Sequence, residues 1–195
     1  RGFIVVTVLM ISRTVLCSFA LTSLLLGSVA AHAQRPAQGP ISRDVIQPEK
    51  LGYRMVWEDE FNGTKLDTTK WLHRGLGARA LAFVSEDAVE VKDGYIYLWA
   101  KRDAAGRMLG SAIGTQQTFM SRYGYYECRA QVQKSWGQWG AFWLQSNQIS
   151  VGEDPAVYGA EIDVMECFRK LGPDIVSHNV HWAYGPNQKS TRGMQ

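Results

Sequence analysis

From residue 53 onward, apolar and polar positions alternate in short runs that are separated by turn signals. Alternation with a period of two is typical of half-buried β-strands, and many short strands at regular spacing are typical of a sandwich or barrel. Asp93 and Gly94 form a hairpin-turn signal between two such runs. No long stretch after residue 50 has helical periodicity, and the sequence has no internal repeat. The pattern predicts strands near 53–58, 83–91, 94–101, 113–121, 123–133, 139–145, 160–167 and 176–183.

One predicted strand carries three acidic residues within six positions, Glu161, Asp163 and Glu166. Successive side chains of a strand point to opposite faces, so Glu161 and Asp163 share a face. Glu166 joins that face only if one extra residue, a β-bulge, lies around 164–165. Strand geometry then brings the carboxyl groups of Glu161 and Glu166 to roughly 5 Å, the spacing of retaining glycosidases. The alternative, an exposed edge strand with solvated acids, leaves the odd spacing unexplained.

The pattern Glu-x-Asp-x-x-Glu at 161–166 resembles the bulged active-site signature of glycoside hydrolase family 16. The resemblance covers roughly residues 53–195 and implies an all-β, concanavalin-like jelly-roll sandwich, two curved sheets with a cleft across the concave one. Family members have several more strands after the catalytic one, so we expect a jelly roll that is C-terminally truncated in this chain. The likeness extends to upstream blocks in the expected order, 57–63, 66–71, 123–130 and 139–144.

The resemblance assigns a role to each of the three acids. Glu161 would be the nucleophile that forms a glycosyl-enzyme intermediate. Glu166 would protonate the leaving oxygen and then activate water, and neighbouring negative charges favour the protonated form that this role needs. Asp163 lies between them on the same face, where it can orient Glu161 and share the proton load.

Trp139 and Trp143 are four positions apart, so they share a face of the predicted strand 139–145. Phe142 and Leu144 point the other way, into the core. Indole rings beside carboxylates are stacking platforms for sugar rings, and in the resembling family the matching tryptophans line the subsites beside the cleavage point. The alternative is that both are core aromatics. Because the opposite face already supplies core residues, we predict that both bind substrate.

His181 is the third candidate substrate-binding residue. It shares a predicted strand face with Ser177 and Asn179, whereas His178 lies on the other face and is expected to be a hydrogen-bonded core residue. The resemblance implies a sugar contact for His181, because laminarinase-like members have such a histidine at about this distance after the acid/base. A purely structural histidine is the alternative.

The resemblance therefore implies an endo-acting glycosidase that hydrolyses internal β-1,3 or mixed β-1,3/1,4 linkages of a laminarin-type glucan with retention. One alternative is an agarase- or carrageenase-type galactan hydrolase of the same family. Another is a catalytically inactive β-glucan-binding module, against which the three intact acids argue. A purely structural or adhesive jelly roll is the third.

Composition limits the partners and cofactors. Hydrophobic residues at 46% and charged residues at 20% are typical of a globular protein. Without residues 1–33, which hold two basic residues and no acid, 19 basic residues face 18 acidic ones, and this balance argues against nucleic acid. No His/Cys cluster has zinc spacing, and there is no phosphate loop, so we predict no cofactor and no metal-ligating residue. A structural calcium, common in the resembling family, and a Cys128–Cys167 pairing stay open.

The first 50 residues follow a different pattern. Arg13 precedes an apolar run over 15–29 and a small-residue cleavage site at 31–33, which predicts a secretory signal peptide. An uncleaved membrane anchor is the alternative. We therefore expect upstream residues and signal peptide at 1–33, a polar, proline-containing linker at 34–50 and the N-terminal and central part of a glycoside hydrolase domain at 51–195. The protein is expected to be secreted or periplasmic, monomeric and without stable membrane association after cleavage.

Overall fold

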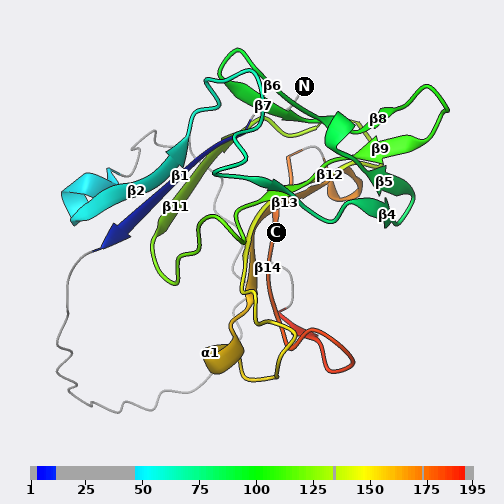
Figure 1. Ribbon diagram of the computed structural model, residues 1–195. Helices are drawn as coiled ribbons and strands as arrows, with labels where there is room; N and C mark the ends of the chain where they lie inside the picture. Colours follow the sequence, from blue (N-terminus) through cyan, green and yellow to red (C-terminus); the bar gives the residue numbers. More distant parts are fainter. Residues whose placement is uncertain (1–3, 12–46, 134, 173, 192–195) are drawn as a thin grey trace, which may run out of the picture.

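Figure 1 shows the computed structural model, which describes residues 4–11, 47–133, 135–172 and 174–191. The described part of the chain consists mainly of short strands, as predicted. The elements are β1 (Ile4–Ile11), η1 (Pro48–Leu51), β2 (Tyr53–Asp59), β3 (Leu72–His73), β4 (Gly77–Arg79), β5 (Ala82–Val84), η2 (Glu86–Ala88), β6 (Val89–Lys92), β7 (Tyr95–Leu98), β8 (Lys101–Arg102), β9 (Met108–Gly110), β10 (Ile113–Gly114), β11 (Tyr125–Ala130), β12 (Trp139–Gln145), α1 (Pro155–Tyr158), β13 (Glu161–Phe168), η3 (Arg169–Leu171), β14 (Ser177–Trp182) and β15 (Lys189–Ser190).

The strands form three larger sheets and one two-stranded pair. A five-stranded sheet has the order β11-β1-β7-β6, with β2 also paired to β1. A four-stranded sheet follows the chain, β12-β13-β14-β15, and another has the order β4-β5-β9-β8. In Figure 1, β1, β2 and β11 run side by side, and β12, β13 and β14 form a separate group that continues down to α1.

Asp93 and Gly94 form the predicted hairpin turn between β6 and β7. Their φ angles are 55° and 72°, and the commonest tight hairpin turn needs such positive values at both central positions. Lys92 pairs with Tyr95 directly across the turn. The turn prediction is therefore confirmed.

The predicted strand 113–121 is much shorter than expected. Only β10 is extended, because the chain turns directly afterwards: the N–H groups of Thr118 and Phe119 both donate to the carbonyl of Thr115 at 2.9 Å. The predicted strand 83–91 is likewise interrupted by the 3-10 turn η2. In both places local hydrogen bonds of polar segments replace the strand ladder.

The core lies where the five-stranded sheet meets strand β12 of the β12–β15 sheet. Phe61, Trp71, Val91 and Ile96 form a buried cluster, and Phe142 from β12 packs against it. This contact places the Phe142 side of β12 against the core, as the alternation in 139–145 predicted. The predicted β-jelly-roll sandwich is confirmed.

Two cysteines of the described chain, Cys128 and Cys167, are free thiols. Cys128 packs against the core cluster and Cys167 is buried. Burial raises the pKa of both thiols, that of Cys128 to about 11, so neither is a reactive thiolate at neutral pH.

The N-terminal predictions fall mainly on residues that the structure does not describe. The apolar run 15–29, the cleavage site 31–33 and most of the linker lie outside the described residues. Ile4–Ile11 forms β1, and Pro48–Leu51 at the end of the predicted linker forms the 3-10 turn η1. Among the described residues there is no helix with the length and apolar character needed to cross a bilayer.

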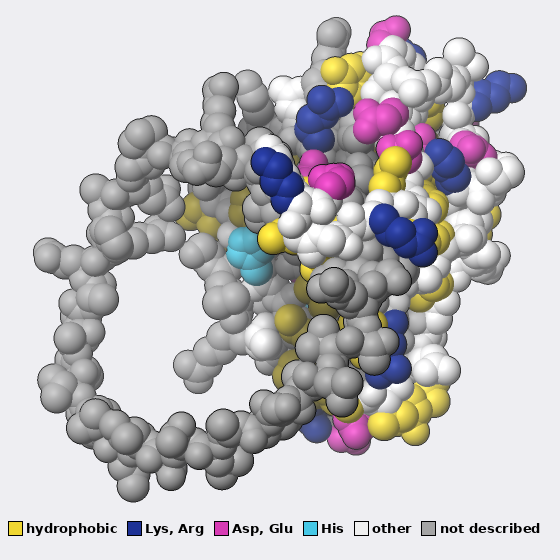
Figure 2. All heavy atoms as spheres, turned by 90° about the vertical axis from the view of Figure 1, so that its left-hand side faces the viewer, with side chains coloured by type: hydrophobic (Ala, Val, Ile, Leu, Met, Phe, Trp, Pro, Cys, Tyr) yellow, Lys and Arg dark blue, Asp and Glu magenta, His cyan; other side chains and the backbone are white. Residues whose placement is uncertain are grey.

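On the face drawn in Figure 2, Lys and Arg side chains are interspersed with Asp and Glu.

Asp59, at the end of β2, is a buried carboxylate that anchors the chain leading into the core. One of its oxygens accepts the indole N–H of Trp71 at 2.8 Å, and the other accepts the backbone N–H of Phe61 at 2.8 Å. Lys70 adds an ion pair at 3.8 Å. A buried carboxylate needs such partners to offset the cost of leaving water.

Asp59→Asn is expected to lower the free energy of unfolding by about 1–3 kcal/mol. The amide has one acceptor oxygen for two donors, so either Trp71 or Phe61 would face an NH₂ group. Urea denaturation checks this, with Asp67→Asn as the matched control. Asp67 is exposed and accepts from Thr69, so this control should change stability by about 0.5 kcal/mol or less. Equal effects of the two substitutions would contradict the role of Asp59.

Candidate active site

Strand β13 contains the predicted extra residue. Against β12, Met165 pairs with Phe142 and Asp163 pairs with Trp143, so Val164 has no partner of its own. Against β14, the register also shifts between Asp163 and Glu166. Two residues on β13 therefore oppose one on β14, which defines a β-bulge. The bulge turns the odd spacing of Glu166 into a position on the same face as Glu161 and Asp163.

His178 lies opposite this bulge and contacts it. Its Nδ1 lies 2.7 Å from the carbonyl oxygen of Val164, and because a carbonyl can only accept, Nδ1 carries the proton. The expectation that His178 is hydrogen-bonded is confirmed, but the expectation that it lies in the core is wrong, because its side chain is exposed. The extra residue leaves a carbonyl that the strand ladder does not satisfy, and His178 satisfies it at the surface.

The register of three strands sets the layout of the carboxylate face. Each acid of β13 has one direct neighbour on β12 and one on β14. From one end to the other the rows are Gln145–Glu161–His181, Trp143–Asp163–Asn179 and Ala141–Glu166–Ser177. Side chains directly opposite one another in a sheet share a face and touch. The predicted site residues are therefore brought together on one surface.

Glu161 accepts a hydrogen bond on each carboxylate oxygen. The side-chain amide of Gln145 donates to Oε2, and the hydroxyl of Tyr184 donates to Oε1 at 2.5 Å. Burial, together with the hydrogen bond to Glu161, raises the pKa of Tyr184, so its hydroxyl keeps its proton. The two neutral donors fix the plane of the Glu161 carboxylate.

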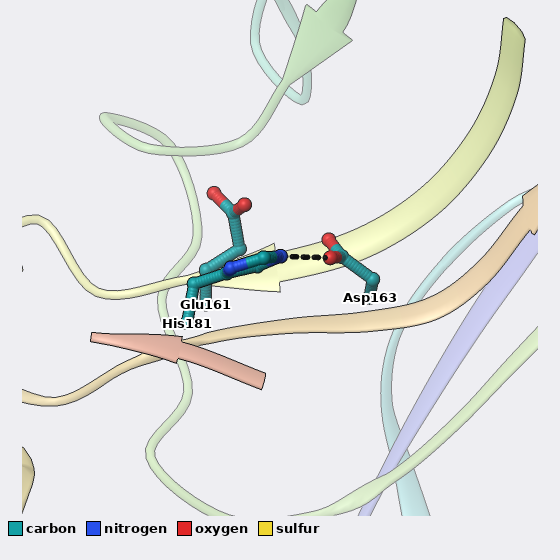
Figure 3. Close-up of side chains that lie close together, drawn as sticks. All are labelled: Glu161, Asp163 and His181. Atoms are coloured by element: carbon teal, nitrogen blue, oxygen red, sulfur yellow. Dashed lines mark ion pairs between the residues drawn. The ribbon is translucent and has the colours of Figure 1, made fainter. Parts of the chain in front are cut away.

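Asp163 is paired with His181, as Figure 3 shows. The distance from Asp163 Oδ2 to His181 Nε2 is 3.0 Å. Asp163 is 5% exposed, and its neighbours on the same strand are acids. Burial, followed by the charges of Glu166 and Glu161, raises the pKa of Asp163 from 3.8 to about 6. With this pKa, Asp163 holds a proton in weakly acidic solution.

Glu166 is buried and is held by two neutral donors. The indole N–H of Trp139 donates to its Oε1 at 2.9 Å, and the amide of Asn179 donates to its Oε2 at 3.2 Å. Both donors come from the face that carries Asp163, which places the Glu166 carboxyl there rather than in the apolar interior.

The two predicted platform tryptophans lie on this face but differ in surroundings. Trp139 is 56% exposed, stacks obliquely on Phe168 and has the guanidinium of Arg79 at 5.5 Å from its ring centre. Trp143 is half-buried, with the guanidinium of Arg74 at 4.7 Å. Each indole ring thus carries a guanidinium, and the more exposed ring of Trp139, beside Glu166, suits sugar stacking better than the half-buried ring of Trp143.

Some residues of the site were not predicted. Gln145 lies two positions after Trp143 and so shares its strand face, and this alternation could have predicted Gln145 as a site residue. Asn179 was placed on the correct face without a role. Tyr184 and Arg74 lie outside the strands that carry the acids, and no sequence signal predicts that Tyr184 bonds Glu161 or that Arg74 bonds Gln145. His181 is on the predicted face, bonded to Asp163, and its sugar contact stays a prediction.

Among the described residues, Glu161, Asp163 and His181 lie close enough together that they could ligate a metal ion. One ligand atom from each lies within 4.8 Å of the others. Asp163 pairs with His181, and both carboxylate oxygens of Glu161 accept from Gln145 and Tyr184, whereas His181 Nδ1 is buried without a partner.

A bulged strand that presents three carboxylates on one face of a jelly-roll sandwich is the arrangement expected of the β-sandwich glycoside hydrolases that the sequence resembles. The chain belongs to the glycosyl hydrolases family 16, whose family model matches residues 78–193. The match includes all three acids and confirms the resemblance drawn from the sequence.

Three curated relatives are similar to this chain. Glucan endo-1,3-beta-glucosidase A1 of Niallia circulans is 29% identical over 158 residues, 69% of this chain and 23% of that protein. Beta-porphyranase D of Zobellia galactanivorans is 30% identical over 176 residues, 78% of this chain and 41% of that protein. Glucan endo-1,3-beta-glucosidase of Cryptopygus antarcticus is 26% identical over 153 residues, 70% of this chain and 54% of that protein. The chain thus spans between 23% and 54% of the lengths of these relatives.

A solved structure supports the fold. It comes from work on endo-acting O-glycanases that prominent members of the human gut microbiota express to initiate mucin breakdown. The TM-score is 0.52 at 23% sequence identity, and the match covers 71% of this chain and 57% of that one. At this identity the likeness supports the sandwich fold alone.

The raised pKa of Asp163 predicts a pH-dependent stability. Because the folded-state value of about 6 exceeds the value of 3.8, the folded protein binds more protons between these pH values. Its stability should therefore fall as pH rises through that window. Asp163→Asn lacks this titration, so wild type should lose stability relative to the variant from pH 4 to pH 7.

Urea denaturation of the full-length protein at several pH values measures the difference. Asp174→Asn, at an exposed position, controls for the loss of one negative charge. The quantity to follow is the unfolding free energy of the wild type minus that of Asp163→Asn. If this difference stays constant or rises from pH 4 to pH 7, it would contradict the burial of a charged Asp163 among acids.

Proposed function

We propose that this protein is a retaining endo-glycosidase. Glu161 attacks the anomeric carbon while Glu166 gives a proton to the leaving oxygen, and the glycosidic C–O bond breaks as the Glu161–carbon bond forms. Glu166 then takes a proton from water, which attacks the same carbon and releases Glu161. Both proton transfers and the covalent step use carboxyl groups of this chain, so the proposed reaction needs no cofactor.

The bulge in β13 is the observation that carries this proposal. It supports two functional carboxyls on one face, each held by its own pair of neutral donors. Asp163 lies between them and hydrogen-bonds His181. A carboxyl whose pKa is about 6 can share a proton with its neighbours as Glu166 changes from acid to base.

We favour β-1,3-glucan or mixed β-1,3/1,4-glucan as the substrate. Two of the three relatives are glucan endo-1,3-beta-glucosidases. Trp139 offers an exposed indole beside Glu166, which suits the apolar face of a glucose ring. His181 lies beside Glu161 and Asp163 on the same face and its side chain is 23% exposed, which supports a sugar contact there.

A galactan hydrolase is the second candidate, and the arginines favour it. Arg74 and Arg79 lie over the rings of Trp143 and Trp139. A guanidinium beside a sugar-stacking indole suits a substrate that carries sulfate or another anion. Beta-porphyranase D is the relative that matches the largest share of this chain among the three.

The predicted signal peptide supports action outside the cytoplasm, where such polysaccharides occur. We accordingly propose a secreted or periplasmic enzyme that works as a monomer. Its partner is the polysaccharide alone.

Glu161→Gln and Glu166→Gln in the full-length protein are each expected to lower kcat on laminarin by about 1,000-fold or more while binding persists. Reducing-sugar release and affinity electrophoresis in laminarin gels check the two parts. Glu153→Gln is the matched control, because Glu153 is exposed and pairs with Lys189. Turnover by Glu161→Gln within tenfold of wild type would contradict the nucleophile assignment.

The substrate is decided by comparing kcat/KM on laminarin, mixed-linkage β-glucan, agarose and a sulfated galactan. If glucan is the substrate, Arg79→Ala should change kcat/KM on laminarin by less than about tenfold. If a sulfated galactan is the substrate, Arg79→Ala should lower kcat/KM on that galactan by about tenfold or more, because an ion pair with sulfate is lost. Binding of laminarin without hydrolysis of any of the four would support the inactive module instead.

A further inference from the structure

The hydrogen bonds to Glu161 continue away from the carboxylate face. Gln145, the last residue of β12, uses both ends of its side-chain amide. Its NH₂ group donates to Glu161 Oε2, and its carbonyl oxygen accepts from Arg74 Nη2 at 2.5 Å. Arg74 and Gln145 are 71 positions apart in sequence, so this contact joins two distant segments of the chain.

Arg74 fixes which way the Gln145 amide points. A guanidinium has only donors, so it accepts no bond from an NH₂ group. The Gln145 oxygen must therefore face Arg74, and the NH₂ group must face Glu161. Without Arg74 the Gln145 oxygen would lose its donor, and the Glu161 carboxylate alone would hold the amide.

Arg74 is itself held from two sides. Its backbone N–H donates to the carbonyl of Ala112 at 2.9 Å, and its guanidinium lies 4.7 Å from the ring centre of Trp143. The guanidinium thus sits between a tryptophan of the carboxylate face and the amide that orients Glu161. Its place is determined before any substrate arrives.

Tyr184 completes the arrangement at the other oxygen. Its hydroxyl donates to Glu161 Oε1 at 2.5 Å, and its backbone N–H donates to the carbonyl of Ile149 at 3.1 Å. Each carboxylate oxygen accepts one of these neutral hydrogen bonds and keeps a further lone pair. The carboxylate is therefore oriented without being neutralised.

We propose that Arg74 and Gln145, together with Tyr184, are positioning residues that hold the Glu161 carboxylate in line with the anomeric carbon. This inference rests on the proposed function, in which Glu161 is the nucleophile. Misplacing a reacting group by about 1 Å can cost about 100-fold in rate. Losing one member of the arrangement should therefore affect the covalent step more than it affects substrate binding.

Gln145→Met keeps the length of the side chain and removes the amide. It is expected to lower kcat by about 10–100-fold with KM changed by less than about threefold. Arg74→Ala should act similarly, and Arg74→Lys should recover part of the loss, because an ammonium also donates to the Gln145 oxygen. Gln188→Met, at an exposed position, is the matched control and should leave kcat unchanged.

A dinitrophenyl glycoside of the disaccharide unit that the wild type cleaves separates the nucleophile from the acid. Its leaving group needs no proton, so Glu166→Ala should spare the first-turnover burst of dinitrophenolate, although it slows the later attack of water. Gln145→Met and Arg74→Ala should stay slow on it. The rate at which a fluorinated glycoside labels Glu161, followed by mass spectrometry, should fall in parallel.

These experiments distinguish a failure of the proposed function from a failure of the positioning role. If Glu161→Gln remains active, the proposed function itself is wrong. If Glu161→Gln is inactive while Gln145→Met and Tyr184→Phe both keep wild-type rates of covalent labelling, only the positioning role is overturned. If urea denaturation shows that Gln145→Met is unfolded, the test rests on Tyr184→Phe alone. A labelling rate lowered about tenfold or more in that variant would support the positioning role, and an unchanged rate would overturn it.

Discussion

One extra residue in β13 is the constraint on which the site depends. A strand alternates its side chains strictly, so Glu161 and Glu166 would lie on opposite faces of a regular strand. The bulge at Val164 changes this parity once, and every contact of Glu166 with the carboxylate face follows from it. His178 satisfies the carbonyl that the bulge leaves without a ladder partner.

The sandwich supplies the other half of this arrangement. Strand β12 presents Phe142 to the buried cluster and Trp139, Trp143 and Gln145 to the acids, so a single strand links the core to the site. The acids are thereby held on a packed layer rather than on a mobile loop, as a preorganised catalytic constellation requires. The donors around Glu161 and Glu166 are neutral, which orients both carboxyls and leaves the charge repulsion among the three acids intact.

Much of this could be predicted from the sequence, because alternation within strands is a local signal. The strand faces and the Asp93–Gly94 turn follow from local patterns, and the bulge was predicted from the five-position spacing of Glu161 and Glu166 together with the family resemblance. The end of β10 at Gly114 could not be predicted, because hydrogen bonds of a local turn replace the strand pairing after it. The contacts of Tyr184 and Arg74 also escaped prediction, since they depend on how separate segments pack and leave no periodic trace.

The stereochemistry of hydrolysis tests the central claim most directly. If the bulge places Glu161 and Glu166 about 5 Å apart, the reaction passes through a glycosyl-enzyme intermediate and keeps the anomeric configuration. Proton NMR of the first product released by the full-length protein from a β-linked oligosaccharide should then show the β-anomer before mutarotation. An α-anomer formed first would mean that the two carboxyls act on a water between them, and it would contradict the account.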